Sequence, residues 1–366
     1  MADQDVPPDL DPDERSALRE LVKGIVVAQG NAFIKELLRE KGIPIGVSKA
    51  AFERNLLEAI DRGTLGRGDL EDWLDEVEGW GDQHIYVYNV PPSIARDPVW
   101  RSAVSVRERV EAAGLGGLWN ASTSRAFPEE MTLTGIRFDV STLQLSWHRA
   151  AETWVREPAR DRREEIEGDL YEFRAYRYRA RRAVTRFVLR RGGSNPAAWV
   201  AAVFIPVAID SPEHERILGR VDEALEGLLE LFDFDQVRSH QVAIANVIRN
   251  LDHAHGAGSA GAAPPVTTQA TRLMSGGAYV EFGALSSSDD YRSSTAVRRV
   301  RRSIRSPQLP DFVGSSGKLQ FLAGRASGLG RDVKVQLFGE DKRIRIWRQL
   351  TASEVWSILD VLRSFQ

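Results

Sequence analysis

Arginine is the side chain in this sequence with the clearest chemical potential, because its flat guanidinium group offers several hydrogen-bond donors to a phosphate. Of the 49 basic residues, 42 are arginine. The stretch from Tyr171 to Arg191 has no acid after Glu172, and its arginines alternate with aromatic residues. These arginines are Arg174, Arg177, Arg179, Arg181, Arg182, Arg186, Arg190 and Arg191. In a strand, positions 177, 179 and 181 share one face, which predicts a basic edge along a nucleic-acid backbone.

The same arginines have a second interpretation. The preceding segment carries acids that could pair with them and leave a neutral surface, namely Glu152, Glu157, Glu164, Glu165 and Glu167. A shorter arginine run follows later in the chain and contains no acid. Its members are Arg298, Arg299, Arg301, Arg302 and Arg305. This run is the simpler phosphate-binding candidate, although such runs also occur as solvated faces.

Residues 33–56 carry a pattern of leucines, glycines and a capped helix start. The residues that form it are Leu37 and Leu38, Gly42-Ile43-Pro44, Gly46, Ser48-Lys49, Phe52 and Leu56. This pattern resembles the SAP domain, a small helix–extended–helix module that binds DNA. The resemblance implies that Ser48, Lys49 and the backbone amides at the helix start lie beside a phosphate, where the helix dipole favours an anion. The alternative is an ordinary helical hairpin with turn and cap residues, one that could bind protein.

A third pattern suggests an enzyme. Pro310-Asp311 followed by Asp332-Val333-Lys334 resembles the PD-(D/E)xK nuclease signature. That resemblance implies that Asp311 and Asp332 bind a divalent metal while Lys334 activates water. An upstream glutamate partner is missing, and such triplets are common in hairpin strands. We therefore treat Asp311, Asp332 and Lys334 as catalytic candidates only, and expect a non-enzymatic protein without cofactor or metal.

Composition sets the outer limits. The chain has 366 residues, a formal charge of −3 and no cysteine, which excludes disulfides, thiolate zinc sites and cysteine nucleophiles. No long apolar segment or secretory signal is evident, so we expect a cytoplasmic protein with no membrane contact. Residues 1–92 have 10 basic and 19 acidic side chains, whereas residues 251–366 have 16 and 10. The acidic front could bind a basic protein partner, and the basic rear could bind DNA.

Periodicity predicts the elements that position these residues. Apolar residues at three- and four-residue steps indicate four helices before residue 79, the first beginning at Pro12 and the third capped by Ser48, and then a strand from His84 to Tyr88. The following part predicts a helix from Pro98 to Ala113, strands over 135–140 and 143–147, a solvated hairpin loop over 157–167, and a buried strand over 199–209. Two further helices are expected, one from Ser211-Pro212 to about Phe232 and one over 242–251.

The end of the sequence has the clearest pattern. Residues 332–338 and 342–347 alternate polar and apolar side chains around Gly339-Glu340-Asp341, which predicts a hairpin. Thr351 with Glu354 predicts a capping box at the start of a helix.

These patterns together predict an α+β protein in three parts. They are a helical SAP-like module (1–90), an antiparallel sheet with covering helices (93–253), and, after a flexible linker (254–268), a β-hairpin–helix unit (269–366). We expect a nucleic-acid-associated adaptor in which Ser48, Lys49 and the arginines contact phosphate. A protein–protein interaction scaffold is the alternative, and a metal-dependent nuclease is the third hypothesis.

Overall fold

The computed structural model has two compact units, each described here by itself. One contains the helices of residues 11–79, and the other contains residues 80–121 and 125–366. The residues that the structure describes are 11–28, 31–121, 128–139, 141–192, 199–207, 213–226, 231–254, 266–275, 277–286, 289–304, 313–324 and 328–366.

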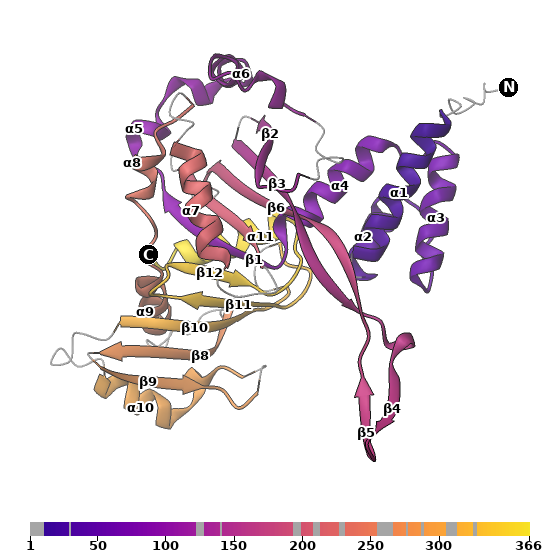
Figure 1. Ribbon diagram of the computed structural model, residues 1–366. Coiled ribbons are helices and arrows are strands. Elements are labelled where there is room, and N and C mark those ends of the chain that lie inside the picture. The colour runs from indigo at the N-terminus through magenta and orange to yellow at the C-terminus, as the bar shows by residue number, and fades with distance from the viewer. Residues whose placement is uncertain are drawn as a thin grey trace. The chain divides into compact units, whose positions relative to one another are not determined.

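The described chain combines helices with one large sheet, as expected for an α+β protein (Figure 1). The α-helices are α1 (Pro12–Ala28), α2 (Asn31–Glu40), α3 (Lys49–Asp61), α4 (Arg67–Trp80), α5 (Pro92–Ala95), α6 (Ala103–Ala112), α7 (Glu213–Glu226), α8 (Phe234–Arg238), α9 (Ile244–Ala254), α10 (Thr295–Ile304) and α11 (Ala352–Arg363). Short 3-10 helices are η1 (Pro98–Arg101), η2 (Gly116–Leu118), η3 (Pro158–Arg160) and η4 (Tyr291–Ser293). None of the described helices is long and apolar enough to cross a bilayer.

The strands alternate with these helices along the chain. They are β1 (Gln83–Asn89), β2 (Thr132–Asp139), β3 (Thr142–Arg156), β4 (Arg162–Ile166), β5 (Asp169–Phe173), β6 (Tyr176–Arg191), β7 (Trp199–Pro206), β8 (Val266–Ser275), β9 (Ala278–Gly283), β10 (Val313–Phe321), β11 (Val333–Phe338) and β12 (Arg343–Ile346). Ten of them form one antiparallel sheet in the order β2-β3-β6-β7-β1-β12-β11-β10-β8-β9, while β4 and β5 pair only with each other.

The helical unit has its own core. Apolar side chains from α1 to α4 pack together, with Leu18, Ile34, Phe52, Leu56 and Leu70 essentially inaccessible to solvent. These are positions that helical periodicity predicts to face inward. Burial of such a set is the main source of stability for a unit of this size.

The structure corrects the expected domain boundaries, because strands from all three predicted parts form a single sheet. Strand β1 was expected to belong to the first module. It instead pairs with β7 on one side and with β12 on the other. Most of the expected linker, residues 255–265, lies outside the described residues, but α9 before it and β8 after it belong to the same unit. The proline pair after β1 also lies within that unit.

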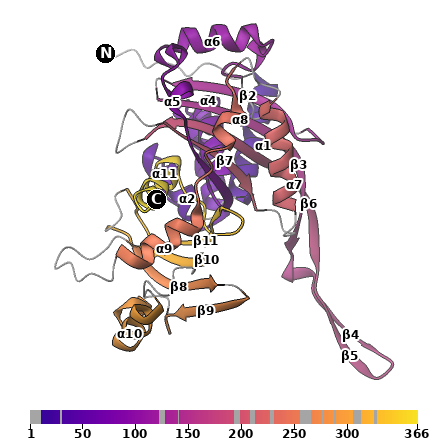
Figure 2. The ribbon, with the colours of Figure 1, turned by 90° about the vertical axis from the view of Figure 1, so that its left-hand side faces the viewer.

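Helices cover the two faces of the sheet unequally. On one face, α9 and α11 pack on the middle strands, with Ile248 and Leu359 in a core that also contains Phe204 and Val335. On the other face, α5 to α8 pack on β2, β3, β6, β7 and β1. Figure 2 shows α9 beside β10 and β11. In the part of the chain that the structure describes, no buried apolar cluster joins a helix to the other side of β8, β10 and β11, and Lys318 and Lys334 are exposed there.

Two expected elements differ in form. The helix predicted over residues 98–113 is divided, because Ser102 has an extended backbone and its hydroxyl accepts hydrogen bonds from the amides of Val104 and Ser105. A 3-10 turn therefore precedes it and α6 begins after it. The charged segment over 157–167 was predicted to be a loop. Part of it forms β4, which pairs with β5 in an exposed hairpin that extends from β3 and β6 (Figure 1).

The predicted end of the chain is confirmed. Strands β11 and β12 form the expected hairpin, with Val335 opposite Ile346. Thr351 and Glu354 form the capping box of α11, in which each side chain accepts a hydrogen bond from the other residue's backbone amide. Both features depend on neighbouring residues, which explains why the sequence alone predicts them.

Candidate nucleic-acid interface

The arginines expected along one strand edge lie mainly on the exposed hairpin and its stem. Arg174 lies between β5 and β6, is exposed, and has its Nη2 3.7 Å from Glu172. Arg177 is exposed in β6. The backbones of Arg179 and Arg181 continue that strand, while their side chains lie outside the described residues. Further along β6, Arg186 is fully buried with its guanidinium 5.1 Å from the Trp80 ring centre.

Four arginines of the second run lie in α10, and Arg305 lies outside the described residues. Arg298 and Arg299 are exposed on this helix, and the side chain of Arg302 lies outside the described residues. The run packs through Val297 on a small cluster of Leu273, Phe282 and Tyr291. Leu273 and Phe282 point to the side of the sheet opposite Arg272 and Glu281, because side chains alternate along a strand. The exposed arginines of α10 therefore lie away from the helix-free side of the sheet.

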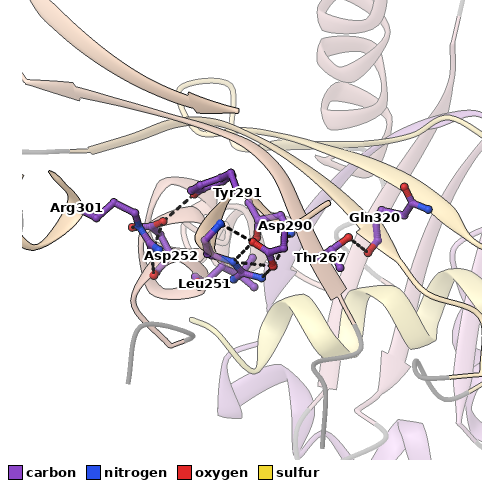
Figure 3. A network of polar contacts seen from close by, with 9 residues as sticks. Leu251, Asp252, Thr267, Asp290, Tyr291, Arg301 and Gln320 are labelled. Atoms are coloured by element: carbon purple, nitrogen blue, oxygen red, sulfur yellow. Dashed lines mark hydrogen bonds and ion pairs between the residues drawn. The ribbon is translucent and has the colours of Figure 1, made fainter. Parts of the chain in front are cut away.

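The expectation that Arg301 contacts phosphate is wrong for this structure, because its side chain is only 3% exposed. Its Nη2 lies 2.6 Å from Oδ1 of Asp252, which is equally buried. The hydroxyl of Tyr291 donates a 2.8 Å hydrogen bond to the same carboxylate. Figure 3 shows this network, in which Arg301 and Tyr291 reach the end of α9. Arg301 therefore anchors α10 to the rest of the fold.

A neighbouring ion pair fixes η4. The carboxylate of Asp290 accepts hydrogen bonds from Nε of Arg292 at 2.8 Å and from the amide of Thr268 at 3.3 Å. Burial by itself raises the pKa of Asp290. The hydrogen bonds and the charge of Arg292 lower it by more, so the pKa of Asp290 lies below its ordinary value. This carboxylate therefore stays ionised and holds the turn before α10 against β8.

In the SAP-like segment, residues 41–48 connect α2 to α3 within the helical unit. Gly42 adopts a positive φ of 64°, and its amide donates to the carbonyl of Arg39 at the end of α2. Ser48 caps α3 as predicted, its hydroxyl accepting from the amide of Ala51 at 3.2 Å. Ser48 and Lys49 are both exposed at this helix start. DNA contact by these residues stays a prediction.

The nuclease candidates divide between described and undescribed positions. Asp311 lies outside the described residues. Asp332 precedes β11 and accepts hydrogen bonds from the amide of Ala323 at 2.8 Å and from the side chain of Gln320 at 2.9 Å. These bonds lower the pKa of Asp332 below its ordinary value. Within the described ranges, no three histidine, aspartate or glutamate side chains gather in a way that could hold a metal ion.

Lys334 instead belongs to a set of side chains on the helix-free side of the sheet. We call this surface the open face and define it by residues of β8 to β12 that lie opposite one another in neighbouring strands. They are Arg272, Glu281, Ser316, Lys318, Gln320, Lys334, Gln336, Phe338, Arg343 and Arg345. One row across the sheet places Lys318, Gln336 and Arg345 side by side. Because neighbouring strands are about 4.8 Å apart, Lys318 and Arg345 rise from backbones about 10 Å apart.

Charge on the open face is unevenly neutralised. Arg272 pairs with Glu281 at 2.6 Å, and Arg343 pairs with Asp341 at 2.9 Å. Lys318 and Lys334 are exposed, and neither forms an ion pair with a carboxylate among the described residues. Burial lowers the pKa of the Arg345 guanidinium, and the nearby Arg343 charge lowers it further against the pull of Asp82. The pKa of a guanidinium group is ordinarily so high that Arg345 stays charged near neutral pH.

Each arginine of the open face lies over an aromatic ring. The guanidinium carbon of Arg345 is 3.6 Å from the centre of Trp347, which follows β12 and is 50% exposed. The corresponding distance is 3.9 Å from Arg343 to Phe338 and 4.7 Å from Arg272 to Tyr279. Arg343 is buried and Phe338 is half-buried, whereas Tyr279 and Trp347 are exposed. Unpaired bases stack on exposed rings and flat cations of this kind.

A cavity of about 300 Å³ opens on the β9–β10 end of this surface. Its lining combines cations, carboxylates and hydroxyls with one aromatic ring, and consists of Arg272, Glu281, Ser315, Ser316, Lys318, Gln336, Phe338, Glu340 and Asp341. The carboxylates restrict where a polyanion can lie. At the other end, the Asp332 carboxylate accepts a hydrogen bond from Gln320, the residue opposite Lys334.

No protein-family model, curated protein or solved structure matches this chain. The candidate site therefore depends on geometry alone. The sequence does contain its signal, since Lys318 and Gln320, Lys334 and Gln336, and Arg343 and Arg345 are the polar positions of three alternating strands. What the sequence does not show is that no helix of the described unit covers them.

Proposed function

We propose that this protein is a non-enzymatic, cytoplasmic adaptor that binds single-stranded nucleic acid across the open face. The observation that carries the proposal is a group of three cations, Lys318, Lys334 and Arg345, that share this face with the exposed ring of Trp347. Lys318 and Lys334 supply ammonium groups, and Trp347 supplies a ring in contact with Arg345. Phosphate contacts provide affinity on such a surface, and base stacking provides tolerance of sequence.

Several features favour a single strand over a duplex. The site is a sheet surface, and its rings can stack only on bases that are unpaired. Its positive charge is moderate because Glu281, Glu340 and Asp341 occupy one end. A duplex, whose affinity depends mainly on neutralising many phosphates, gains little from such a surface.

The test is a binding titration of the full chain with a labelled oligothymidylate about 20 nucleotides long, against a duplex of the same length. We expect the single strand to bind more tightly. If Lys318, Lys334 and Arg345 each contact one phosphate, log affinity falls against log salt with a slope of about −2. Replacing both Lys318 and Lys334 by alanine reduces affinity at least about tenfold and lowers that slope by about 1.4.

The matched comparison uses arginines on α10. Arg298→Ala with Arg299→Ala also removes two exposed positive charges, but on the other side of the sheet. We expect this variant to bind like the wild type. Equal losses of affinity from both variants would indicate nonspecific attraction by net charge. Loss of affinity only from the α10 variant would indicate that nucleic acid binds to the arginines of α10 instead. Absence of any binding at low salt would reject the proposal.

Stacking gives an independent measurement. Trp347→Ala removes an exposed ring, whereas Trp347→Phe keeps one. Since base–aromatic stacking is worth about 1–3 kcal/mol, alanine should weaken binding about tenfold and phenylalanine should restore most of it. Quenching of tryptophan fluorescence on binding should disappear from the Trp347→Phe variant if this ring is the platform. Unchanged quenching would place the bound bases elsewhere.

The SAP-like segment gives a second proposed contact in the helical unit. The resemblance implies that Lys49 contributes to DNA binding, and its exposed position at the start of α3 is compatible with that role. Lys49→Ala in the full chain should then weaken duplex binding more than single-strand binding. If Lys49→Ala weakens neither duplex nor single-strand binding, the open face remains the proposed site.

A further inference from the structure

Strands β4 and β5 form a hairpin, here called the arm, that pairs with no strand of the main sheet. All ten residues of these strands are exposed. Apolar side chains are among them, with Leu170 72%, Tyr171 46% and Phe173 37% exposed. A two-stranded hairpin is marginally stable in water by itself, and exposed apolar clusters on soluble proteins mark interaction surfaces.

The base of the arm is firmly held, so its orientation is defined. Both carboxylate oxygens of Asp161 accept hydrogen bonds from the Arg156 guanidinium, and one also accepts from the amide of Ala175 at 2.9 Å. Arg156 donates in addition to the carbonyl of Ala175 at 3.0 Å and lies 5.3 Å from the ring of Tyr176. The hydrogen bonds from Arg156 and Ala175 lower the pKa of Asp161 to about 2, so this clamp persists across the neutral range.

One face of the arm carries most of its apolar side chains and has opposite charges at its two ends. Register places Arg162 opposite Phe173, Glu164 opposite Tyr171, and Ile166 opposite Asp169. Side chains at these positions share a face because strand side chains alternate. The opposite face, with Arg163, Glu165, Leu170 and Glu172, has a single apolar residue.

Along the first face the charge changes sign from base to tip. Arg162 lies at the base, its guanidinium carbon 4.9 Å from the Phe173 ring centre. Asp169 lies at the tip, after the turn formed by Glu167 and Gly168, both with positive φ. Two such faces placed together in opposite directions bring each Arg162 to an Asp169 of the other arm. The Tyr171 rings then meet near the centre.

We propose that the arms of two copies of this chain pack face to face and antiparallel, forming a symmetric dimer. A two-fold axis near Tyr171 and Glu164 relates the two arms, as isologous interfaces require. It also brings the two Glu164 carboxylates together, and each of them lies 3.9 Å from the Arg162 guanidinium of its own arm. The apolar contacts join Ile166, Tyr171 and Phe173 across the axis. The charge order of the same face selects the antiparallel direction, since parallel arms would place like charges together.

Sedimentation velocity over a range of concentrations tests this proposal. The wild-type chain should show a concentration-dependent monomer–dimer equilibrium. Tyr171→Ser with Phe173→Ser should raise the dimer dissociation constant at least tenfold, while Val104→Ser, at an exposed position on α6, should leave it unchanged. The three substituted side chains are exposed, so folding of the variants should be preserved, and circular dichroism checks this. A wild-type chain that stays monomeric at every concentration overturns the proposal.

A charge-reversal pair tests the direction. Arg162→Asp alone places acid opposite Asp169 of the other copy, and Asp169→Arg alone places two cations together, so each variant should be mainly monomeric. An equimolar mixture should form a heterodimer, because each altered end then meets an opposite charge. Failure of the mixture to associate, or a dimer that ignores both substitutions, rejects arm-to-arm packing.

Discussion

Asp252 and Arg301 form an ion pair in which both side chains are almost fully buried. Such a pair is costly to break, because removing one partner leaves a charge without water or counter-charge. Asp252→Ala should therefore destabilise the unit by about 3–5 kcal/mol. Urea unfolding followed by circular dichroism measures this loss.

The control is an exposed pair of the same charges. Lys23 and Glu20 lie one helical turn apart in α1 with more than half of each side chain exposed. Glu20→Ala should change stability by less than about 0.5 kcal/mol. A comparable loss from both variants would show that burial of Asp252 is not the cause.

Asp290 predicts a dependence of stability on acid pH. Burial opposes ionisation of this side chain, but the hydrogen bonds and charge of Arg292 lower its folded pKa below the unfolded value of about 3.8. A lowered folded pKa contributes stability above the unfolded pKa and loses it as the pH falls through the folded pKa. Asp290→Asn should thus cost about 1–3 kcal/mol near pH 7. The difference from the wild type should shrink below pH ~4, and thermal unfolding across pH measures it; a constant difference would contradict the assignment.

At the scale of elements, the capping box of α11 gives a direct prediction. The Thr351 hydroxyl accepts from the Glu354 amide at 3.3 Å, and the Glu354 carboxylate accepts from the Thr351 amide at 3.0 Å. Thr351→Ala should reduce stability by about 1 kcal/mol because the Glu354 amide loses its acceptor. Thr351→Ser, which keeps the hydroxyl, should lose only a small part of this. Equal losses from alanine and serine would indicate a packing role for the methyl group.

Local signals explain which elements the sequence predicts correctly. The cap at Ser48, the box at Thr351 and the β11–β12 hairpin each involve residues a few positions apart, so their chemistry is visible in the linear order. Strand β4 was missed because its residues are nearly all charged, and only its pairing with β5 makes it a strand. The break at Ser102 depends on one residue whose capping outweighs helical periodicity on both sides.

The two units each have a separate core, which gives a prediction for the whole molecule. Leu56 is fully buried among the α1–α4 helices, and Phe204 is fully buried under α11 in the sheet unit. Leu56→Ala should cost about 2–5 kcal/mol in the helical unit alone. Amide hydrogen exchange should show faster opening of α1 to α4 with unchanged protection of β7. Phe204→Ala should reverse that pattern, and loss of protection in both units from either variant would show a single cooperative structure.

Tertiary arrangement also decides how far the candidate site can be predicted. The sequence identifies Lys334 as a candidate residue, but as part of a nuclease signature. It also predicts that Arg301 contacts phosphate. The alternation in β10 to β12 shows which side chains are polar, whereas the absence of a covering helix depends on where distant segments pack. Burial of Arg301 depends likewise on Asp252, a residue far away in the chain.

The position of β1 has a consequence for biosynthesis. Gln83 of β1 lies opposite both Pro206 and Ile346. During synthesis, the ribosome therefore makes β1 long before it makes the two strands that pair with it. Until residues 343–346 emerge, one border of β1 has no neighbour, and unpaired borders invite pairing between nascent chains. Sequence separations this large also slow spontaneous folding. Maturation of this protein should accordingly depend on chaperone capacity more than its modest size suggests.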